Sequence, residues 1–254
     1  MNDKTKTKTE YQKRFDLFKE NLNDLDNYHI EKLVELSMCT NMLSDFEEVV
    51  SWAKKNQENF STSIKEIPLK DMNNWIINES KIQHSSGKFF EILGLRIGEN
   101  EDREVGEGWD QPIVKENNFD GGVLGLIRSY IDDLPHYLVQ ARFEPGNYGP
   151  IQISPTLQAT FSNLNQEHGG RKPHYSEFFE DYVDETKDYK FNSWLAEDGG
   201  KFYRKRNRGL VKQVKYDEVL LVDDSFKWLS LFQIKKLMEF DSLINPHLSR
   251  LIFL

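Results

Sequence analysis

The stretch LIRSYIDDLPHYLVQARF, residues 126–143, constrains the possible folds more than any other part of the chain. Two apolar runs flank a polar turn at Asp132–Pro135, which is the pattern of two strands joined by a tight turn. Similar short runs, KFFEILGLRIG, QPIVKE and KFYRKRNRGLVKQV, lie on either side of it. Glycine, aspartate and proline residues separate them. The sequence therefore predicts an antiparallel or mixed sheet.

Helical patterns precede and follow these strands. Apolar residues recur at helical spacing between residues 11 and 60, and the aromatic residues of segment 175–182 fall on one helical face. Capping signatures predict three helix starts, at Ser44 with Glu47, at Ser230 with Gln233, and at Asn245 before Pro246. We therefore predict an α+β fold with helices packed around the sheet. The expected organisation is a disordered tail over 1–10, a helical segment over 11–60 and a catalytic domain over 61–254.

Composition narrows the class of protein. Only 38% of the 254 residues are apolar and 30% are charged, yet 10 Tyr, 17 Phe and 5 Trp argue for a folded body, because disordered chains are poor in aromatics. A net charge of -9 disfavours nonspecific binding to nucleic acid. The sequence has no apolar run of 18 residues and no apolar N-terminal stretch, so we expect no membrane span and no signal peptide. A single cysteine excludes an internal disulfide, and we expect a cytoplasmic location.

Polar side chains follow one face of two neighbouring strands. In HYLVQARFEP, the period of two places Gln140, Arg142 and Glu144 together, opposite the apolar residues. The rigid loop PGNYGP follows, and IQISP then places Gln152 and Ser154 on one face. A solvated surface is the ordinary interpretation of such a pattern. Two adjacent strands that present amides, a guanidinium and a carboxylate favour instead a polar floor beneath a ligand.

Two further clusters carry potential chemistry. HSSGKFF, which begins at His84, is either an ordinary turn or a site with an imidazole, two hydroxyls and Lys88. RKRNR alternates arginines on one strand face, an arrangement that suits a phosphate or diphosphate unless it is simply solvated: Arg204, Arg206 and Arg208. His168 and His174 lie six residues apart in a glycine-rich loop, which is a weak metal signature. Glycine-rich dinucleotide, P-loop and serine-elbow motifs are absent from the sequence.

Several blocks together resemble the nucleotide-sugar 2,3-dehydratase family of deoxysugar biosynthesis. They are HSSGKFFEILGLRI, WDQPIVKE, LVQARFEPGNYGPIQISPTLQATFSN with the following HGG, FYRKRNRGLV and FKWLSLFQIKKLM. The resemblance covers about Trp75 to Met238, and the EPGN…QISPTLQAT block is very specific. It implies a Nudix-hydrolase-like fold without the acidic Nudix box. Family members have two related halves, whereas this chain resembles a single repeat, so we expect a homodimer.

The resemblance implies loss of water across C2 and C3 of a nucleotide-linked 4-keto-6-deoxy sugar, with dTDP as the expected nucleotide. The C4 ketone acidifies the C3 hydrogen, so we expect no cofactor and no metal. Glu144 is the first choice for base, because an apolar Phe143 and Pro145 favour its protonated form. The alternative is that Glu144 only pairs with Arg142. His84 or a nearby tyrosine is the next candidate for the base.

The remaining expected roles concern binding. Lys88 completes the expected catalytic set. Together with Arg142, Arg204 and Arg206 it is expected to face the diphosphate or the enolate. The expected substrate-binding residues are Ser85, Ser86, Gln140, Arg142, Gly146, Asn147, Gln152, Ser154, Thr156, Gln158, Asn163, His168, Arg204 and Arg206. Two other functions stay open at this point. One is a noncatalytic nucleotide-sugar binding module or partner subunit, and the other is a lyase or epimerase that also deprotonates C3.

Overall fold

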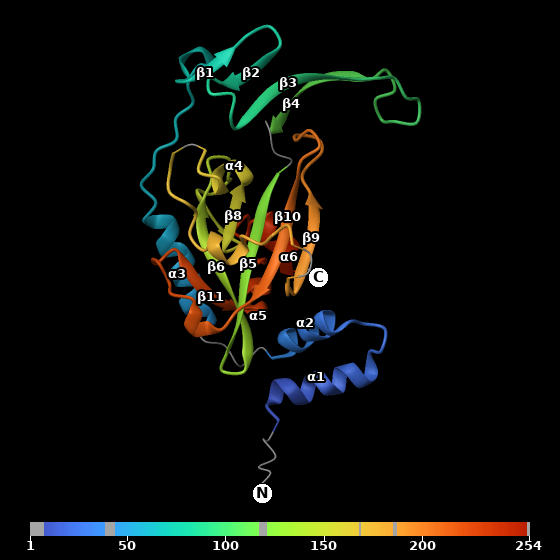
Figure 1. Cartoon of the computed structure of the whole chain (residues 1–254), viewed down its shortest axis with the longest axis vertical. Coiled ribbons are helices and arrows are strands. Elements are labelled where there is room, and N and C mark those ends of the chain that lie inside the picture. Colours follow the sequence, from blue (N-terminus) through green and yellow to red (C-terminus); the bar gives the residue numbers. More distant parts are fainter. Residues whose placement is uncertain (1–7, 39–43, 117–120, 168, 185–186, 253–254) are drawn as a thin grey trace, which may run out of the picture.

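The computed structural model describes residues 8–38, 44–116, 121–167, 169–184 and 187–252. Figure 1 shows an elongated molecule with an N-terminal helix pair at one end, a central sheet with helices, and a small sheet at the other end. Of the expected tail, residues 1–7 lie outside the described residues. Residues 8–10 are already ordered, since Thr9 caps the first helix by accepting from the Gln12 amide at 3.2 Å.

The central sheet is mixed, which confirms the predicted α+β class. Its order is β11-β6-β5-β10-β9, with β10 parallel to β5 and the other pairs antiparallel. Asp132 and Asp133 join β5 to β6 with φ angles of 48° and 64°, values that aspartate tolerates and that suit a tight hairpin. The strands are β5 (Gly121–Ile131), β6 (Leu134–Phe143), β9 (Phe191–Ala196), β10 (Arg206–Gln213) and β11 (Phe226–Ser230).

The hairpin of β5 and β6 forks beyond its turn. The two strands pair directly only up to Ile127 and Leu138. Past that point β7 (Ile151–Ser154) pairs with β6, and β8 (Leu157–Thr160) pairs with β5. Thr156 lies buried at the fork, where its hydroxyl accepts from the Ile127 amide at 2.9 Å and donates to the Leu138 carbonyl. One side chain thus replaces the backbone pairing that the fork removes.

Two apolar cores cover the two faces of this sheet. The first holds Leu124, Val139 and Leu229 and packs against α3 (Phe46–Glu58), α5 (Leu231–Leu237) and α6 (Pro246–Ile252). The second holds residues of β5, β8 and β10 with Tyr175 and Phe179. The helix expected over 175–182 is only a 3-10 turn, Ser176–Phe179, because Tyr175 has a left-handed backbone with φ 62°. The short segment α4 (Phe161–Leu164) follows β8.

Two of the three predicted helix starts are confirmed. Ser230 and Gln233 form a capping box at α5, and the Asn245 side chain accepts from the His247 amide at 3.0 Å at the start of α6. The prediction at Ser44 is wrong. Asp45 caps α3 by accepting from the Glu48 amide, and its carboxylate is the stronger acceptor for an exposed helix end.

The N-terminal helices dock through a buried ionic network. They are α1 (Glu10–Asn21) and α2 (Asn27–Ser37), and α2 places Glu31 and Glu35 each 2.9 Å from the Arg128 guanidinium of β5. The Tyr137 hydroxyl donates to Glu35 at 2.7 Å, and burial raises the pKa of Tyr137. Burial also lowers the pKa of Lys32 to about 8. Such a network costs desolvation energy, so every member needs its partner.

A second, smaller sheet lies within the segment expected as one catalytic domain. It is antiparallel in the order β1-β2-β3-β4, with β1 (Trp75–Ile77), β2 (Lys81–His84), β3 (Phe90–Ile97) and β4 (Trp109–Glu116). A 3-10 turn, Leu69–Asp71, precedes it. Val114 joins it to the body through backbone bonds with Lys201 and Tyr203 at 2.9 and 2.8 Å. Across the described ranges, the helices are too short or too polar to cross a membrane.

Candidate functional site

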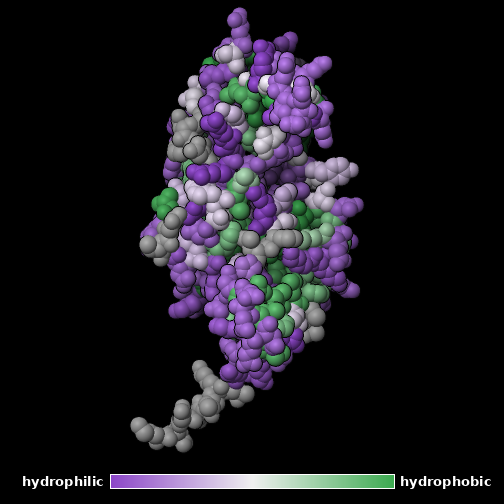
Figure 2. Space-filling model, turned by 90° about the vertical axis from the view of Figure 1, so that its right-hand side faces the viewer, coloured by the Kyte–Doolittle hydropathy of each residue, from purple (hydrophilic) through white to green (hydrophobic). Residues whose placement is uncertain are grey.

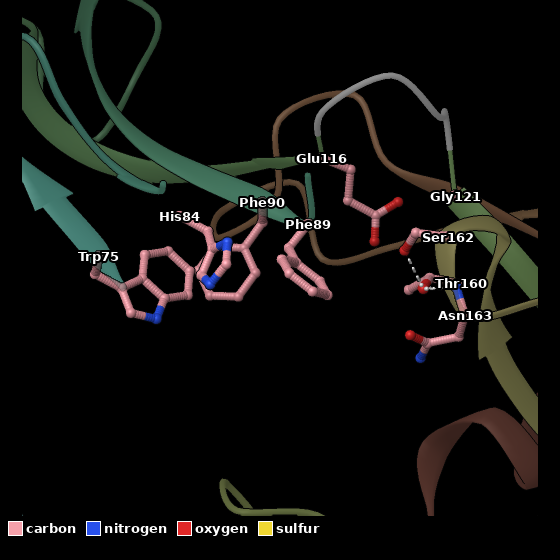
Figure 3. A pocket seen from close by; sticks show the side chains of 9 residues that line it. All are labelled: Trp75, His84, Phe89, Phe90, Glu116, Gly121, Thr160, Ser162 and Asn163. Atoms are coloured by element: carbon pink, nitrogen blue, oxygen red, sulfur yellow. Dashed lines mark hydrogen bonds between the residues drawn. The ribbon is translucent and has the colours of Figure 1, made fainter. Parts of the chain in front are cut away.

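A cavity of about 430 Å³ lies where the small sheet meets the central body. Figure 3 shows its two walls, with the aromatic side chains on the side of the small sheet and the polar ones on the side of the body. Cavities between structural layers are the usual place for a small-molecule site. The lining residues are Trp75, His84, Phe89, Phe90, Glu116, Gly121, Thr160, Ser162 and Asn163.

The aromatic wall comes from three strands and one strained turn. The Trp75 and Phe90 rings lie 4.9 Å apart, and the His84 ring lies 4.9 Å from Phe89. Phe89 has φ 69°, an outlier for a bulky residue, directly before β3. Strain of this kind concentrates at functional sites. The wall can pack against one face of a planar ring.

His84 is placed on the cavity wall with a defined hydrogen-bond pattern. The Ser86 backbone N–H donates to Nδ1 of His84 at 3.2 Å, and the Ser86 hydroxyl lies 2.7 Å from the same nitrogen. An N–H donor at Nδ1 leaves the proton of a neutral imidazole on Nε2. Neutral His84 therefore offers a hydrogen-bond donor. Ser85 and Ser86 themselves are exposed in the turn.

The polar wall begins at the end of β8. Thr160 caps α4 by accepting from the Asn163 amide at 3.3 Å, and its hydroxyl lies 2.9 Å from that of Ser162. Figure 3 shows the Glu116 carboxylate reaching toward this wall from β4. Lys205 neutralises Glu116 at 2.6 Å. The wall thus combines hydroxyls, an amide and one paired carboxylate.

Close strand contacts let this wall continue along the sheet. A Cβ at Gly121 would lie 1.5 Å from the Arg206 carbonyl, and one at Gly122 would lie 2.3 Å from the Ala159 carbonyl. Glycine therefore permits β8, β5 and β10 to meet, with Thr160 and Asn207 both beside Gly122. Gln158 lies two residues before Thr160 and therefore on the same face of β8.

Glu144 is held at the end of this polar strip. The Gln158 amide donates to Glu144 Oε1 at 2.7 Å, and Arg142 Nε lies 3.4 Å from the same oxygen. Within the described ranges, Oε2 of Glu144 has no hydrogen-bond partner, and the side chain is 30% exposed. Arg142, the partner considered from the sequence, and Gln158, expected instead to bind substrate, thus both contact one carboxylate oxygen and leave the other available.

A histidine that the sequence analysis missed lies near Glu144. His247 Nε2 is 3.5 Å from Glu197, which also accepts from the Asn207 side chain. Burial lowers the pKa of His247, while the carboxylates of Glu197 and Glu144 act in the opposite direction. The lowered pKa favours the neutral form of the His247 imidazole. In the sequence, His247 is marked only by its place in the first turn of α6, and this position does not predict the contact with Glu197.

Several expected binding residues instead hold the backbone. The Gln152 amide donates to the Ser242 carbonyl at 3.0 Å and accepts from Asn245 at 3.1 Å. Ser154 is fully buried opposite Gln140 in the β6–β7 pair, and Thr156 is used at the fork. The register of β6 and β7 confirms the shared face that the period of two predicted, but Gln152 on it binds the C-terminal segment and Ser154 is buried.

The arginine ladder does not form as expected. Arg204 lies before β10 with φ 54°, so it is outside the strand pattern. Arg206 and Arg208 lie 4.2 and 5.3 Å from the Trp194 ring. They share the face of Val123 in the second core, whereas Gln158 shares the face of Leu124 in the first. These arginines and Gln158, the residue that binds Glu144, are therefore on opposite faces of the sheet.

The last expected residues lie in loops. Lys88 donates to the Glu167 carbonyl at 3.3 Å and so ties the β2–β3 turn to the segment after α4. Asn147 donates its backbone N–H to the Glu144 carbonyl at 3.1 Å in a turn that includes Gly146. His168 lies outside the described residues. Among the residues that are described, no group of three or more His, Cys, Asp or Glu side chains is placed to hold a metal ion.

We expect Thr156→Val to destabilise the fold by about 1–3 kcal/mol, because it leaves the buried Ile127 amide and Leu138 carbonyl without their shared partner. Urea unfolding measures this loss. Ligand affinity of the folded variant should stay within about twofold of the parent, because the valine keeps the shape of the fork. If Thr156→Val kept its stability but bound ligand much more weakly, the result would contradict this structural role and support the original prediction that Thr156 binds substrate.

The sequence profile of the NDP-hexose 2,3-dehydratase family matches residues 46–253, and the chain belongs to this family. This confirms the resemblance drawn from the EPGN…QISPTLQAT block. The dTDP-4-dehydro-6-deoxy-α-D-glucopyranose 2,3-dehydratase of Amycolatopsis orientalis is 35% identical over 205 residues, 78% of this chain and 42% of that protein. Enzymes of the same name from Streptomyces violaceoruber and Saccharopolyspora spinosa are also 35% identical, over 72% and 83% of this chain and 40% and 42% of theirs.

The chain spans about two fifths of the length of these curated relatives. Among solved structures, the Ap4A hydrolase of C. elegans aligns with 48% of this chain and 88% of its own, at 11% identity and a TM-score of 0.26. A likeness this weak carries no conclusion about fold or activity. The mixed α+β architecture rests on the strand pairing itself, and its relation to Nudix hydrolases stays a prediction.

Proposed function

We propose that the protein removes water across C2 and C3 of a nucleotide-linked 4-keto-6-deoxy sugar, with dTDP as the nucleotide. Family membership and the printed names of three relatives support the reaction. The observation that carries it is an aromatic cavity with Thr160 on its polar wall. Gln158 lies two residues before Thr160 on the same face of β8 and binds Glu144, whose second carboxylate oxygen is available.

The two walls suit the two ends of such a substrate. Trp75 and Phe90 offer a surface on which a pyrimidine ring packs. Asn163 and the hydroxyls of Thr160 and Ser162 can hydrogen-bond to sugar hydroxyls. Lys88, at the edge of the β2–β3 turn, is the proposed diphosphate contact. Binding the nucleotide far from the reacting carbons would position the sugar for chemistry.

The proposed chemistry needs one base and donors for an enolate. Glu144 Oε2 takes the C3 proton, and the electron pair of the C–H bond moves to the C4 oxygen to form an enolate. The enolate then reforms the ketone and expels the C2 hydroxyl, which takes the proton back from Glu144 and leaves as water. Nε2–H of neutral His84 is the proposed donor to the enolate oxygen. The carboxylate is regenerated, and a C2=C3 double bond remains.

A second candidate function is a noncatalytic nucleotide-sugar binding module or partner subunit. The observation that favours it is that Gln158 and Arg142 both bind Glu144, as they would if this carboxylate only shaped the loop. Such a module would keep the cavity and bind the sugar without changing it. Binding and turnover must therefore be measured on the same preparation.

We expect metal-stripped protein to consume dTDP-4-keto-6-deoxyglucose with loss of one water, because the C4 ketone of the substrate already accepts the electron pair. Mass spectrometry and NMR of the product measure this. Turnover that chelation abolishes and one divalent ion restores would contradict the mechanism. A sugar that binds tightly and is recovered unchanged would favour the binding module.

A homodimer and a cytoplasmic location belong to the same proposal. The homodimer follows from the resemblance to a family with two related halves, and one cysteine in 254 residues offers no disulfide framework of the kind common in secreted domains. Sedimentation at low micromolar concentration tests the dimer, which should have a mass near twice 29.9 kDa.

A further inference from the structure

A row of paired residues crosses the central sheet from the polar wall of the cavity. Thr160 of β8 pairs with Gly122 of β5, and Gly122 pairs with Asn207 of β10. Residues that oppose one another on neighbouring strands lie on the same face of a sheet. Gly122 has no side chain, so the middle strand places nothing between Thr160 and Asn207, which lie about 10 Å apart, two strand spacings. The row therefore runs from a cavity-lining residue to β10.

Helix α6 lies over the same face and places His247 at the far end of this row. A Cβ at Gly209 would lie 3.1 Å from Leu251 Cδ2, so Leu251 covers β10 two residues beyond Asn207. His247 precedes Leu251 by four residues and so projects from the same side of α6. One helical turn advances about 5.4 Å and two strand residues about 6.6 Å, which puts His247 beside Asn207. The distance of 3.5 Å from His247 Nε2 to Glu197, which accepts from Asn207, confirms this position.

The orientation of His247 is fixed by the groups around it. The Asn245 side chain accepts from the His247 backbone N–H at 3.0 Å, and Arg250 donates to the Ala196 carbonyl, which ties α6 to the end of β9. The carboxylate of Glu197 faces Nε2, so this nitrogen carries the proton of a neutral imidazole. Nδ1 of His247 is left with a lone pair and acts as a hydrogen-bond acceptor.

Charge links His247 to Glu144. Burial lowers the pKa of His247, and the carboxylates of Glu197 and then Glu144 act in the opposite direction. Arg250 and Lys205, the cations that face the ring, lower this pKa further. The effect of Glu144 means that its carboxylate and the imidazole are close enough to act on each other. The lowered pKa favours the neutral imidazole, the form that accepts at Nδ1.

Both members of this pair lack a hydrogen-bond donor. Among the described residues, Nδ1 of His247 is buried without a hydrogen-bond partner, and Oε2 of Glu144 has none either. Buried polar atoms without a partner are few in native proteins, and each calls for an explanation. Two acceptors do not bind each other, but one added proton joins them. The C3 proton that Glu144 takes in the proposed reaction is such a proton.

We propose that His247, oriented by Glu197, is a positioning residue for the base Glu144. Nδ1 accepts a hydrogen bond from Oε2–H once Glu144 has taken the C3 proton, so this role rests on the proposed function. The proton stays on Oε2 while the electron pair of the C–H bond is in the enolate, and it then leaves with the C2 hydroxyl as water. No further acid, base or co-reactant takes part. A hydrogen bond that the protonated carboxyl donates favours that form and makes Glu144 the better base.

Three substitutions of His247 test this role through turnover. His247→Leu removes the acceptor and should lower kcat about 10-fold, the factor that one hydrogen bond contributes, with little change in KM. His247→Gln offers an amide N–H to Glu197 and a carbonyl oxygen to Glu144, so it should recover most of this loss. His247→Lys places a cation beside Glu144, favours its carboxylate form and should lower kcat about 100-fold or more. If packing alone mattered, leucine would be tolerated best, and that order would overturn the role.

The pH profile of kcat gives a readout that packing does not move. As pH falls through the pKa of His247, Nδ1 gains a proton, becomes a donor and holds Glu144 as the carboxylate. The kcat of the parent should therefore fall on the acid side at a pH below 6.5, the usual value of a histidine. His247→Gln does not titrate, so in this variant the fall should move to lower pH by about one unit or more. An acid limb at the same pH in both proteins would overturn the role.

His29 provides a matched control. It is exposed on α2, and its Nδ1 lies 2.9 Å from Asp26. Figure 1 places α2 at the end of the molecule opposite the small sheet, and Figure 2 shows apolar side chains gathered over the N-terminal helices there. His29→Gln and His29→Lys should leave kcat and its pH profile unchanged. Equal losses at His29 and His247 would reveal a general effect of charge and overturn the specific role.

An NMR titration tests the pairing without turnover. The imidazole signals of His247 should give a pKa below 6.5 in the parent and a still lower one in Glu144→Gln, because a carboxylate that favours the imidazolium is gone. Identical titrations in the two proteins would overturn the pairing. If the titration shows the pair but the parent never changes the 4-keto sugar, the proposed function is rejected and the role with it. If the parent removes water but the three variants of His247 turn over alike, only the role of His247 is rejected.

Discussion

Glu144→Gln should lower turnover about 10²–10⁴-fold, the usual loss on removing a general base, and should change substrate affinity only a few-fold. The amide keeps the size of the carboxylate, so the contacts with Gln158 and Arg142 can rearrange around it without a cavity. What it loses is the ability of the second oxygen to accept the C3 proton. Steady-state kinetics with dTDP-4-keto-6-deoxyglucose measures the first effect, and calorimetry measures the second.

Hydrogen exchange makes this test independent of water loss. In D₂O the parent should exchange the C3 hydrogen of recovered substrate, and Glu144→Gln should not. Gln158→Glu is a useful comparison, because it removes the amide donor and places a second carboxylate beside Glu144. Near-full activity of Glu144→Gln would place the base elsewhere, and His84→Ala would be the next variant to measure.

Arg128→Met should destabilise the protein by about 3–5 kcal/mol, the usual cost of breaking a buried ion pair by removing one partner. Arg128 is 0% exposed and pairs with Glu31 and Glu35, each at 2.9 Å. Methionine fills much of the same volume but leaves two carboxylates between α2 and the sheet without their main counterion. Urea unfolding should show the loss as a lower midpoint.

The control is an ion pair of the same type in water. Arg96→Met removes the ion pair with Asp110. Both side chains of this pair are largely exposed, so we expect the free energy of unfolding to change by only about 0–1 kcal/mol. Adding Glu35→Gln to Arg128→Met should recover part of the stability, because one uncompensated charge is removed. Equal losses for the two single variants would show that the network does not hold the N-terminal helices to the sheet.

Local patterns in the sequence determined much of the secondary structure. Alternation over 121–143 and two aspartates that tolerate positive φ specify the β5–β6 hairpin. The signatures at Ser230 and Asn245 specify two helix starts. These features depend on residues a few positions apart, so they can be recognised in one dimension. The prediction of a helix start at Ser44 was wrong because Asp45, the next residue, is the stronger N-cap.

The candidate site was predicted only in part. Period two placed Arg142 and Glu144 on a common face, and the HSSGKFF segment identified His84 on the cavity wall. Trp75 and Gly121 were missed, because nothing near them in the sequence marks a site. The assignment of Thr156 to substrate failed for a related reason. Its hydroxyl is consumed by Ile127 and Leu138, partners that only the fork of the sheet brings to it.

The sequence by itself determined the family, the hairpin, two helix caps and the sidedness of the polar strand, because each depends on short-range spacing or on residue identity. Tertiary structure alone decided that β10 runs parallel to β5, that Arg206 and Arg208 lie on the face opposite Gln158, and that Glu197 meets His247. These outcomes depend on pairing between segments tens of residues apart. Side-chain periodicity defines the faces of each strand, but it does not define which strand lies beside it.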